Sequence, residues 1–193
     1  KKTKISLGAQ NCHTSSEYGA FTGSVNAKMI KNLGAKFVIL GHSENRIAGE
    51  TDNIIKKKIL SAVKENLIVI FCIGETNLQK RQKKTFQVLR KQILSCLKGI
   101  KKNTKIIVAY EPVWSIGTGN IPKNSDIDKN INFIKKILKK NINFKNPKVL
   151  YGGSVSSKNI RIIDKVKSID GYLIGGASQN EKKLIDIVKK TYN

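Results

Sequence analysis

The sequence has few cysteines and no long apolar run, and both shortages exclude whole classes of protein. Its three cysteines, Cys12, Cys72 and Cys96, are odd in number and lack the spacing of metal ligands. This favours a reduced, cytoplasmic protein over a disulfide framework or a metal site. The longest apolar run, 67–73, has only seven residues. A helix that spans a bilayer needs roughly 20, so we expect no membrane-embedded segment.

Acidic residues are also scarce: 13 Asp and Glu stand against 37 Lys and Arg, which gives a formal net charge of +24. Such a balance invites a nucleic-acid-binding interpretation. However, 33 of the basic residues are lysine and only 4 are arginine, whereas nucleic-acid surfaces usually also recruit arginine and stacking aromatics. In 131–140 the lysines flank or oppose an apolar stripe, as on a solvated helix face. We therefore expect no specific nucleic-acid partner.

Six short apolar runs alternate with amphipathic stretches, and no linker or low-complexity segment separates them. The runs are rich in Ile and Val, as strands buried on both faces are, and they cover residues 5–9, 37–40, 67–73, 106–109, 149–151 and 172–174. The stretches between them have a 3.6-residue apolar period, and residues typical of N-caps occur at 51–52, 124–126 and 156–157. This alternation predicts six strand–helix units around a parallel sheet, in a single domain over 1–193.

Glycine positions decide between the two folds that such an alternation allows. An open doubly wound sheet should carry a phosphate fingerprint such as G-x-G-x-x-G after its first strand, but residues 10–14 contain no glycine. Glycine pairs instead follow the last two runs, at 152–153 and 175–176, where barrel enzymes frequently bind phosphate. We therefore predict an α/β fold containing strands three to eight of a (β/α)8 barrel. Because a complete barrel needs about 250 residues, we expect the first two βα units to be missing from the front.

Polar residues cluster after the second run. His42 and Glu44 come directly after 37–40, and barrel active sites are built where strands end. His42 could act as an acid–base group or could satisfy a backbone group at the strand end. Glu44 could act on a substrate or could favour the dipole of a helix start. The residues alone leave both alternatives open.

Glu111 is the second candidate, because it precedes a segment with the composition of a lid. The stiff sequence 112–114 is followed by a tip that contains Gly117 and Gly119, and Pro122 stiffens the exit. Long loops inside compact domains tend to be functional. We therefore expect Glu111 to be a catalytic base, covered by a lid that excludes water.

The two glycine pairs suggest a site for an anion. Each would leave backbone N–H groups exposed at a helix N-terminus, where a phosphate dianion is favoured. One such pair usually marks a tight turn. Two pairs after consecutive strands, each followed by a serine hydroxyl from Ser154 or Ser178, point more specifically to phosphate.

Taken in order, seven segments closely resemble the triosephosphate isomerase family, and together they extend along the whole chain. They are residues 9–12, 19–23, 39–44, 72–75, 109–119, 151–155 and 170–178. The lid segment 109–119 is the most specific of them. The resemblance implies a (β/α)8 TIM barrel that interconverts dihydroxyacetone phosphate and D-glyceraldehyde 3-phosphate without a cofactor or a metal.

The resemblance also implies roles for individual residues. Glu111 would take the proton from the carbon next to the carbonyl, and neutral His42 would polarise the carbonyl oxygen and shuttle protons between the two oxygens. Glu44 would be a supporting acid. The N–H groups that would bind the phosphate belong to Gly117, Ser154, Gly175 and Gly176.

The stretch 11–23 resembles a loop that reaches into a partner subunit, with Asn11 at its start and Thr22 near the partner's site. A homodimer is therefore implied. One departure is that the family usually has arginine after His-Ser-Glu, where this chain has Asn45 and then Arg46, so an expected ion pair is weakened or replaced. A second is the family's Asn-x-Lys element, whose lysine holds the substrate's negative charge. That element cannot lie before Lys4, and no motif nominates another lysine, so we expect the 193-residue chain alone to be impaired.

Three alternatives remain at this point. Another phosphate-binding barrel, such as a sugar-phosphate epimerase, would share the late glycine pairs but not the segment 110–114. Metal-dependent versions would need more ligands, and His13 and His42 are the only histidines. The other two alternatives are a basic nucleic-acid-binding protein and a degenerate chain retained for assembly.

Overall fold

The protein is described here from a computed structural model covering residues 5–101 and 104–192, and its strands form one parallel sheet. The strands are β1 (Gly8–Ala9), β2 (Phe37–Leu40), β3 (Ile68–Ile73), β4 (Ile106–Tyr110) and β5 (Lys148–Tyr151). They lie in the order β1-β2-β3-β4-β5, so strands adjacent in sequence are adjacent in space. Val38 pairs with Val69, and Val108 pairs with Val149. The predicted parallel α/β architecture is confirmed.

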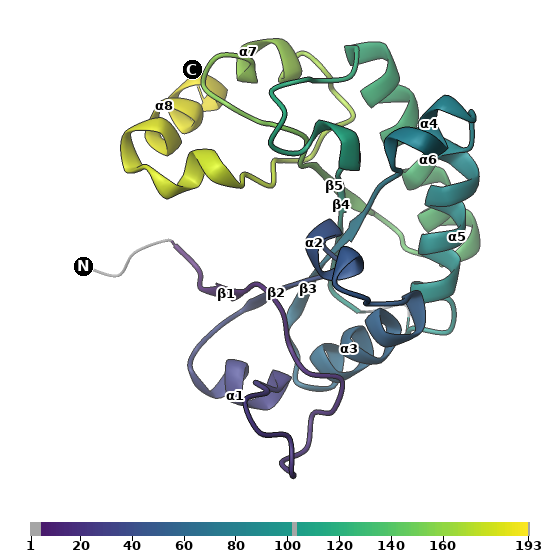
Figure 1. Cartoon of the computed structure of the whole chain (residues 1–193), viewed down its shortest axis with the longest axis vertical. Helices are drawn as coiled ribbons and strands as arrows, with labels where there is room; N and C mark the ends of the chain where they lie inside the picture. The colour runs from purple at the N-terminus through teal and green to yellow at the C-terminus, as the bar shows by residue number, and fades with distance from the viewer. Residues whose placement is uncertain (1–4, 102–103, 193) are drawn as a thin grey trace.

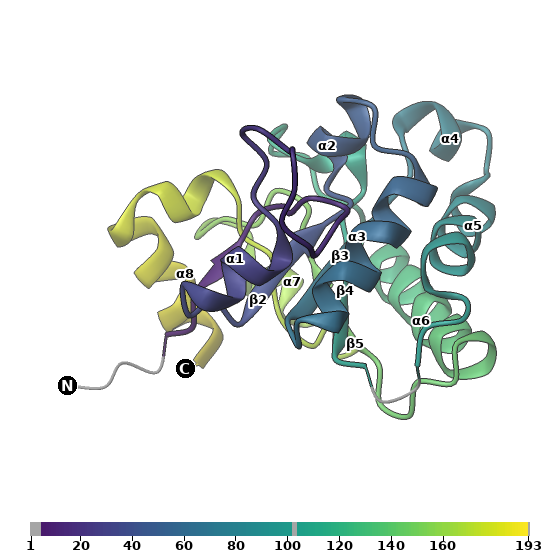
Figure 2. The ribbon, with the colours of Figure 1, turned by 90° about the horizontal axis from the view of Figure 1, so that it is seen from below.

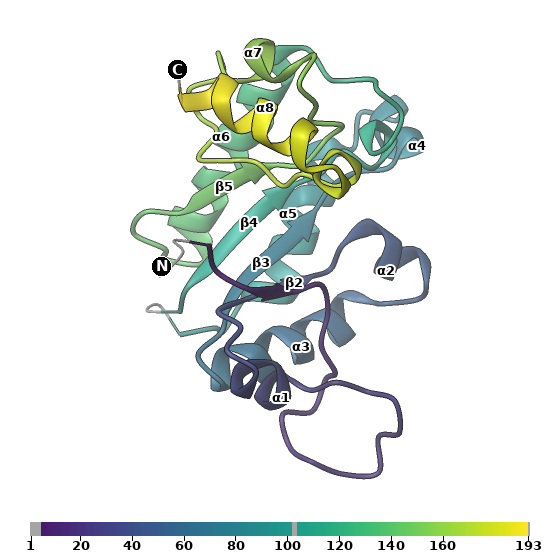
Figure 3. The same ribbon diagram turned by 90° about the vertical axis from the view of Figure 1, so that its left-hand side faces the viewer.

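Helices connect successive strands. They are α1 (Ala27–Asn32), α2 (Ser43–Ile47), α3 (Asp52–Lys64), α4 (Asn77–Arg81), α5 (Thr85–Leu97), α6 (Asn124–Asn141), α7 (Ile160–Ile163) and α8 (Glu181–Tyr192), with 3-10 turns η1 (Val113–Ser115) and η2 (Gly176–Gln179). In Figure 1 the helices form an arc around the strands, and the arc is open on the left between β1 and α8. Figure 3 shows β2 to β5 side by side, with α5 behind them and α8 in front. In Figure 2, α2 and α4 lie along the upper edge, where β2 and β3 end.

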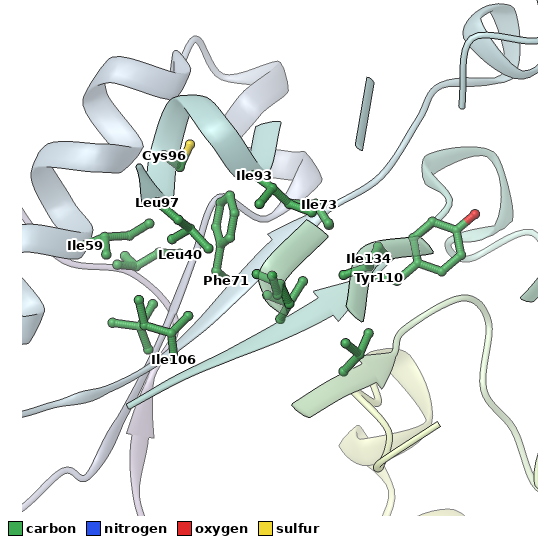
Figure 4. Close-up of a cluster of buried hydrophobic side chains, with 14 of the residues drawn as sticks. Leu40, Ile59, Phe71, Ile73, Ile93, Cys96, Leu97, Ile106, Tyr110 and Ile134 are labelled. Atoms are coloured by element: carbon green, nitrogen blue, oxygen red, sulfur yellow. The ribbon is translucent and has the colours of Figure 1, made fainter. Parts of the chain in front are cut away.

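The hydrophobic core lies between the sheet and the long helices. Figure 4 shows Ile59 of α3 and Ile93 and Leu97 of α5 packed around Leu40 and Phe71 of the sheet. All five are fully buried. Each such side chain stabilises the fold by about 1.5–3 kcal/mol, so this layer holds the strand ends in place. The stripe predicted in 131–140 is confirmed as well, because its four apolar residues are buried in α6.

The sixth predicted strand is much shorter than the apolar run 172–174. Only Tyr172 forms a parallel bridge, with Tyr151, through hydrogen bonds that join Tyr151 to Gly171 and Leu173. The first strand is likewise limited to Gly8–Ala9 of the predicted 5–9. Both segments lie at edges of the described sheet, where a strand has a neighbour on one side only and the ladder that would extend it is absent.

The predicted burial of the strands on both faces is correct for only one face. Residues that point toward the helices are buried, whereas the alternating residues Phe37, Ile39, Ile70, Ile107 and Leu150 are only half-buried. Successive side chains of a strand point to opposite faces. The helices cover one face of this open sheet, and its other face is covered only in part.

The predicted N-cap is correct at Thr51, whereas at 124–126 the helix start is right but the capping differs, and at 156–157 the helix begins later than predicted. Thr51 caps α3 by accepting from the Ile54 N–H at 3.3 Å, as expected. Asn124, in contrast, is the first residue of α6, and its side chain donates to the Ile162 carbonyl instead of capping. The helix expected after 156–157 begins only at Ile160. Short polar side chains bond readily to nearby backbone groups, which makes their exact role difficult to infer from sequence. Within the described residues, no helix is long and apolar enough to cross a membrane.

Candidate active site

A cavity of about 1030 Å³ lies where the strands end, and it brings the predicted site residues together. His42 follows β2 and Glu111 follows β4. Ser154 comes from the loop after β5, and Gly175 and Gly176 come from the segment after the Tyr172 bridge. All five line the cavity. Residues more than 130 positions apart in the sequence therefore line the same cavity, because the strands that carry them end at the same edge of the sheet.

Glu111 is a buried carboxylate with one free oxygen. Its residue is 4% exposed, and its Oε1 lies 3.4 Å from His42 Nε2. Its Oε2 is buried and has no hydrogen-bond partner among the described residues. A buried acceptor without a partner is costly, and such exceptions in a cleft often mark a functional group. Glu111 therefore has an oxygen available to accept a proton from a ligand.

Two glycines allow the close packing around Glu111. A Cβ on Gly74 would lie 1.8 Å from the Glu111 carbonyl oxygen, and one on Gly152 would lie 2.7 Å from Glu111 Cγ. Neither distance is tolerable, so only glycine fits at these two positions. The Glu111 N–H also donates to the Ile73 carbonyl at 2.8 Å, which fixes the backbone of the carboxylate to β3.

His42 is the N-cap residue of α2, and this placement orients its ring. Its Nδ1 accepts from the Glu44 N–H at 3.4 Å, which leaves Nε2 to face Glu111. The hydrogen bond with Glu111 raises the pKa of His42 above its usual 6.5, although partial burial opposes that shift. Glu44 has a side chain that is 84% exposed, with Oε2 3.8 Å from His42 Nδ1. The structure thus gives His42 both a capping role and a place in the site.

The segment after Glu111 is built as a lid with a fixed start and a glycine tip. Val113–Ser115 form η1, and Gly117 and Gly119 have φ values of +69° and +77°, in the left-handed region that favours glycine. Ser115 is buried and its Oγ donates to the Asn120 carbonyl, which ties the two ends of the tip together. The tip itself is exposed.

Ser154 connects the lid to the far side of the cavity. Its Oγ donates to the Ser115 carbonyl and accepts from the Gly119 N–H at 3.2 Å. Its backbone has a φ of +47°, which is unusual for a residue with a side chain. Strained backbone of this kind clusters at functional sites. The hydroxyl was predicted to accompany a phosphate site, and the structure shows that it also holds the lid.

The lid begins on a buried acid that the sequence analysis did not select. Glu75 comes two residues after the end of β3, and it accepts from Trp114 Nε1 at 2.9 Å and from the Tyr110 hydroxyl at 3.2 Å. Burial raises the pKa of Glu75 despite these hydrogen bonds. An acid two residues after a buried apolar run was a signal available in the sequence. Lys80 Nζ lies over the Trp114 ring, 3.3 Å from its centroid.

Comparisons with known proteins agree with this geometry. A model of the family described as triosephosphate isomerase matches residues 1–191. A curated triosephosphate isomerase from Mycoplasma mobile is 42% identical over 186 residues, covering 95% of this chain and 74% of that protein. One from Mesomycoplasma hyopneumoniae strain 232 is 45% identical over 177 residues, covering 91% of this chain and 70% of that protein. The crystal structure of the Bartonella henselae enzyme superposes with a TM-score of 0.87 at 34% identity, covering 98% of this chain and 77% of that one.

The chain belongs to the triosephosphate isomerase family. It is therefore an isomerase, and its parallel sheet and helices are part of a TIM barrel. The chain spans about three quarters of the length of these relatives. Family membership favours the isomerase over the epimerase and nucleic-acid-binding alternatives.

The first glycine pair, 152–153, differs from the prediction that it exposes N–H groups to an anion. Gly152 and Gly153 are buried, and the Gly152 N–H donates to the Tyr110 carbonyl at 3.0 Å. A Cβ on Gly153 would lie 2.3 Å from the Tyr151 hydroxyl. This pair therefore serves close packing beside Glu111, and its N–H groups are not both exposed as expected.

The remaining predicted phosphate ligands do present free donors. The N–H groups of Gly117, Ser154, Gly175 and Gly176 donate no hydrogen bond within the described part of the chain. Gly175 and Gly176 are exposed at the start of η2, and a Cβ on either would meet nothing within 4 Å. Glycine is thus not required there by packing. These positions instead expose backbone N–H groups to the cavity.

At the position after His-Ser-Glu, where the family usually has arginine, this chain makes different contacts. Arg46 pairs with Asp52 at 2.7 Å and donates to the Gly41 carbonyl at 2.8 Å. Asn45 accepts instead from Asn11 Nδ2 at 3.2 Å. The cation beside this amide is Lys58 of α3, which pairs with Glu50 and donates to Asn11 Oδ1 at 2.9 Å. Lys58 was not singled out in the sequence, because its neighbours in α3 include two further lysines.

The predicted partner loop projects from the body of the protein between β1 and α1, at the bottom of Figure 3. Asn11 anchors its start through the contacts with Lys58 and Glu50. Thr22 is exposed on its outer part, together with the large side chains of Tyr18 and Phe21. No cluster of three or more His, Cys, Asp or Glu side chains suited to a metal occurs within residues 5–101 and 104–192.

Proposed function

We propose that the cavity interconverts dihydroxyacetone phosphate and D-glyceraldehyde 3-phosphate through an enediolate, with Glu111 as the base. The observation that carries this proposal is the buried Glu111 carboxylate, which has a free Oε2 and faces His42 Nε2 across 3.4 Å. A buried base with one oxygen that has no partner, next to a donor that can reach a carbonyl oxygen, has the arrangement needed to remove a proton beside that carbonyl.

The proton transfers follow from the positions of the two side chains. Glu111 removes a proton from the carbon bearing the hydroxyl, and the electrons of that bond form the enediolate. The Nε2–H of His42 donates to the oxygen on which charge develops, and His42 then moves the proton between the two oxygens. Glu111 finally returns its proton to the neighbouring carbon, so the base and the atom count are both restored.

Neutral His42 can serve as this donor through Nε2–H, and its surroundings favour that tautomer. The N–H of Glu44 donates to Nδ1, so that nitrogen carries no proton. The raised pKa of His42 depends first on its direct hydrogen bond with Glu111. A substrate seated between the two side chains separates them and removes that contribution, which lowers the pKa of His42 toward its ordinary value.

The phosphate is bound by the four free N–H groups on the opposite wall. Backbone donors at the start of a turn favour a dianion, and these belong to Gly117, Ser154, Gly175 and Gly176. Gly117 lies on the lid, so binding of the phosphate favours lid closure. A closed lid excludes water from the enediolate and prevents loss of its phosphate.

A coupled assay for glyceraldehyde 3-phosphate formation on the purified chain tests this proposal. The unaltered chain is expected to convert dihydroxyacetone phosphate above the buffer rate with no added metal or cofactor, although at a reduced rate, because no motif supplies the lysine of the family's Asn-x-Lys element. Glu111→Asp shortens the base by one methylene and is expected to lower kcat by about 100-fold, because misplacement of a reacting group by roughly 1 Å has that effect. Failure of the unaltered chain to exceed the buffer rate would contradict the proposal.

We further propose that the chain is cytoplasmic, functions as one domain, and forms a homodimer through the loop 11–23. The loop exposes Tyr18 and Phe21, and Val25 just after the loop is exposed as well; large apolar side chains exposed together on one projecting segment suit a partner surface. Sedimentation velocity of the unaltered chain and of Phe21→Asp tests the dimer. A dimer for the first and a monomer for the second are expected, whereas equal sedimentation of both would contradict this use of the loop.

A further inference from the structure

Two lysines on the cavity wall stand next to the proposed phosphate site, and no sequence motif selected either of them. Lys158 and Lys183 line the same cavity as His42 and Glu111. The other Asp, Glu, Lys or Arg side chains that line this cavity are Glu44 and Glu111. A phosphate dianion brought into a cavity with two carboxylates meets repulsion, which backbone N–H groups alone offset only in part.

The positions of the two lysines follow the two glycine-containing segments. Lys158 comes five residues after Gly153, and Lys183 comes seven residues after Gly176. Both side chains are exposed, and neither forms an ion pair or a side-chain hydrogen bond within the described residues. Their charges are therefore available to a ligand, unlike that of Lys58, which is already paired with Glu50.

The segments that carry these lysines are fixed relative to each other. Asn159 Nδ2 donates to the Ser154 carbonyl at 2.8 Å, and its Oδ1 accepts from the Ser156 N–H, so the loop around Lys158 is tied to the phosphate side of the cavity. Lys190 of α8 donates to the Ser157 carbonyl at 3.0 Å and pairs with Asp186 on its own helix. This contact links the loop of Lys158 to the helix that carries Lys183.

We propose that Lys158 and Lys183 together supply the positive charge that holds the substrate's phosphate in this chain. The inference rests on the proposed function, because it assigns further ligands to the same phosphate site. The lysines act by charge and not by fixed geometry, since long exposed side chains reach a dianion through water or directly. They favour phosphorylated three-carbon substrates over neutral ones and take no part in the proton transfers.

The test is calorimetric binding of glycerol 3-phosphate, which has the phosphate and the three carbons but no carbonyl to isomerise. The variants are Lys158→Gln, Lys183→Gln and the double variant. Lys182→Gln is the matched control, because Lys182 is exposed on the same turn of α8 but does not line the cavity. Each cavity variant is expected to weaken binding by about two- to fivefold, and the double variant by roughly tenfold. Lys183→Arg, which keeps the charge, should bind like the unaltered chain.

Two further readouts distinguish this inference from its alternatives. In the isomerase assay, the double variant should raise KM for dihydroxyacetone phosphate while kcat changes by less than about twofold. The difference in binding between it and the unaltered chain should shrink at high salt. An equal loss with Lys182→Gln would show that the general positive field acts instead, and this would overturn the inference. Unchanged binding of glycerol 3-phosphate by the double variant would overturn only the inference about the two lysines. An unaltered chain that neither binds glycerol 3-phosphate nor isomerises dihydroxyacetone phosphate would overturn the proposed function as well.

Discussion

Replacing Lys58 by methionine should destabilise the protein strongly, because it removes the cation from a nearly buried polar cluster. Lys58 pairs with Glu50 and donates to Asn11 Oδ1 at 2.9 Å. Its side chain is 10% exposed and that of Glu50 is 13% exposed. The second oxygen of Glu50 already lacks a partner among the described residues. Without Lys58, the carboxylate would keep only the bond from Asn11 Nδ2.

The magnitude follows from the burial of the pair. Removing one partner of a buried ion pair costs about 3–5 kcal/mol, and the slight exposure of both side chains places this case near the lower value. For 193 residues, an unfolding entropy of about 2.1 cal/mol/K per residue converts 3 kcal/mol into a fall in Tm of about 7 °C. Methionine retains most of the apolar stem, so loss of packing adds little.

Thermal unfolding followed by far-UV circular dichroism measures this change. Lys57→Met is the matched control, because Lys57 is exposed on the same helix, and its Tm should stay within about 1 °C of the unaltered chain. Adding Asn45→Arg to Lys58→Met should recover part of the loss, since Asn45 contacts the same Asn11 amide as Glu50 does. A Tm for Lys58→Met equal to that of the control would refute the reasoning.

Three other changes give independent tests. Burial raises the pKa of Asp170, but hydrogen bonds from two lysines and the Val149 N–H outweigh it and lower the pKa below its ordinary 3.8. Asp170→Asn should therefore lower the free energy of unfolding by about 1–2 kcal/mol at neutral pH. In chemical denaturation this loss should fade as pH falls below about 4, because the carboxylate stabilises the fold only while it is ionised, and a difference that persists at low pH would exclude the charge as its cause. Ser154→Ala removes both bonds to the lid and should lower kcat/KM by about tenfold, whereas unchanged kinetics would show that the lid closes without it. Gly152→Ala places a methyl group 2.7 Å from Glu111 Cγ and should lower kcat by about 100-fold, and full activity would mean that Glu111 can shift without penalty.

Much of the fold could be predicted because the buried strands and helix stripes have clear apolar periods. β2, β3 and β4 lie within one residue of their predicted runs, and the apolar stripe of α6 is buried as expected. The edges could not be predicted as well. The run 172–174 is as apolar as a strand, but strand length also depends on the neighbour that supplies hydrogen bonds, and Tyr172 has such a neighbour on one side only.

Site residues that lie in a recognisable local motif could be predicted, whereas those whose role depends on partners far away in sequence could not. Glu111 and His42 were recognised from their local segments, and they do meet in the cavity. Glu75 and Lys58 were missed, because their importance comes from burial and from partners 39 and 47 residues away in sequence. The glycines at 152–153 were interpreted as anion ligands, since sequence does not show which neighbour a missing Cβ makes room for.

The central claim is that Glu111 removes a carbon-bound proton, and exchange of that proton with solvent measures the step directly. Dihydroxyacetone phosphate is incubated with the protein in heavy water, and deuterium on its hydroxymethyl carbon is followed by proton NMR. The unaltered chain should introduce deuterium at a rate that depends on protein concentration. Glu111→Gln keeps the size of the side chain but removes the base, and it should slow exchange by about 100- to 10,000-fold. Exchange by the glutamine variant at the rate of the unaltered chain would contradict the account.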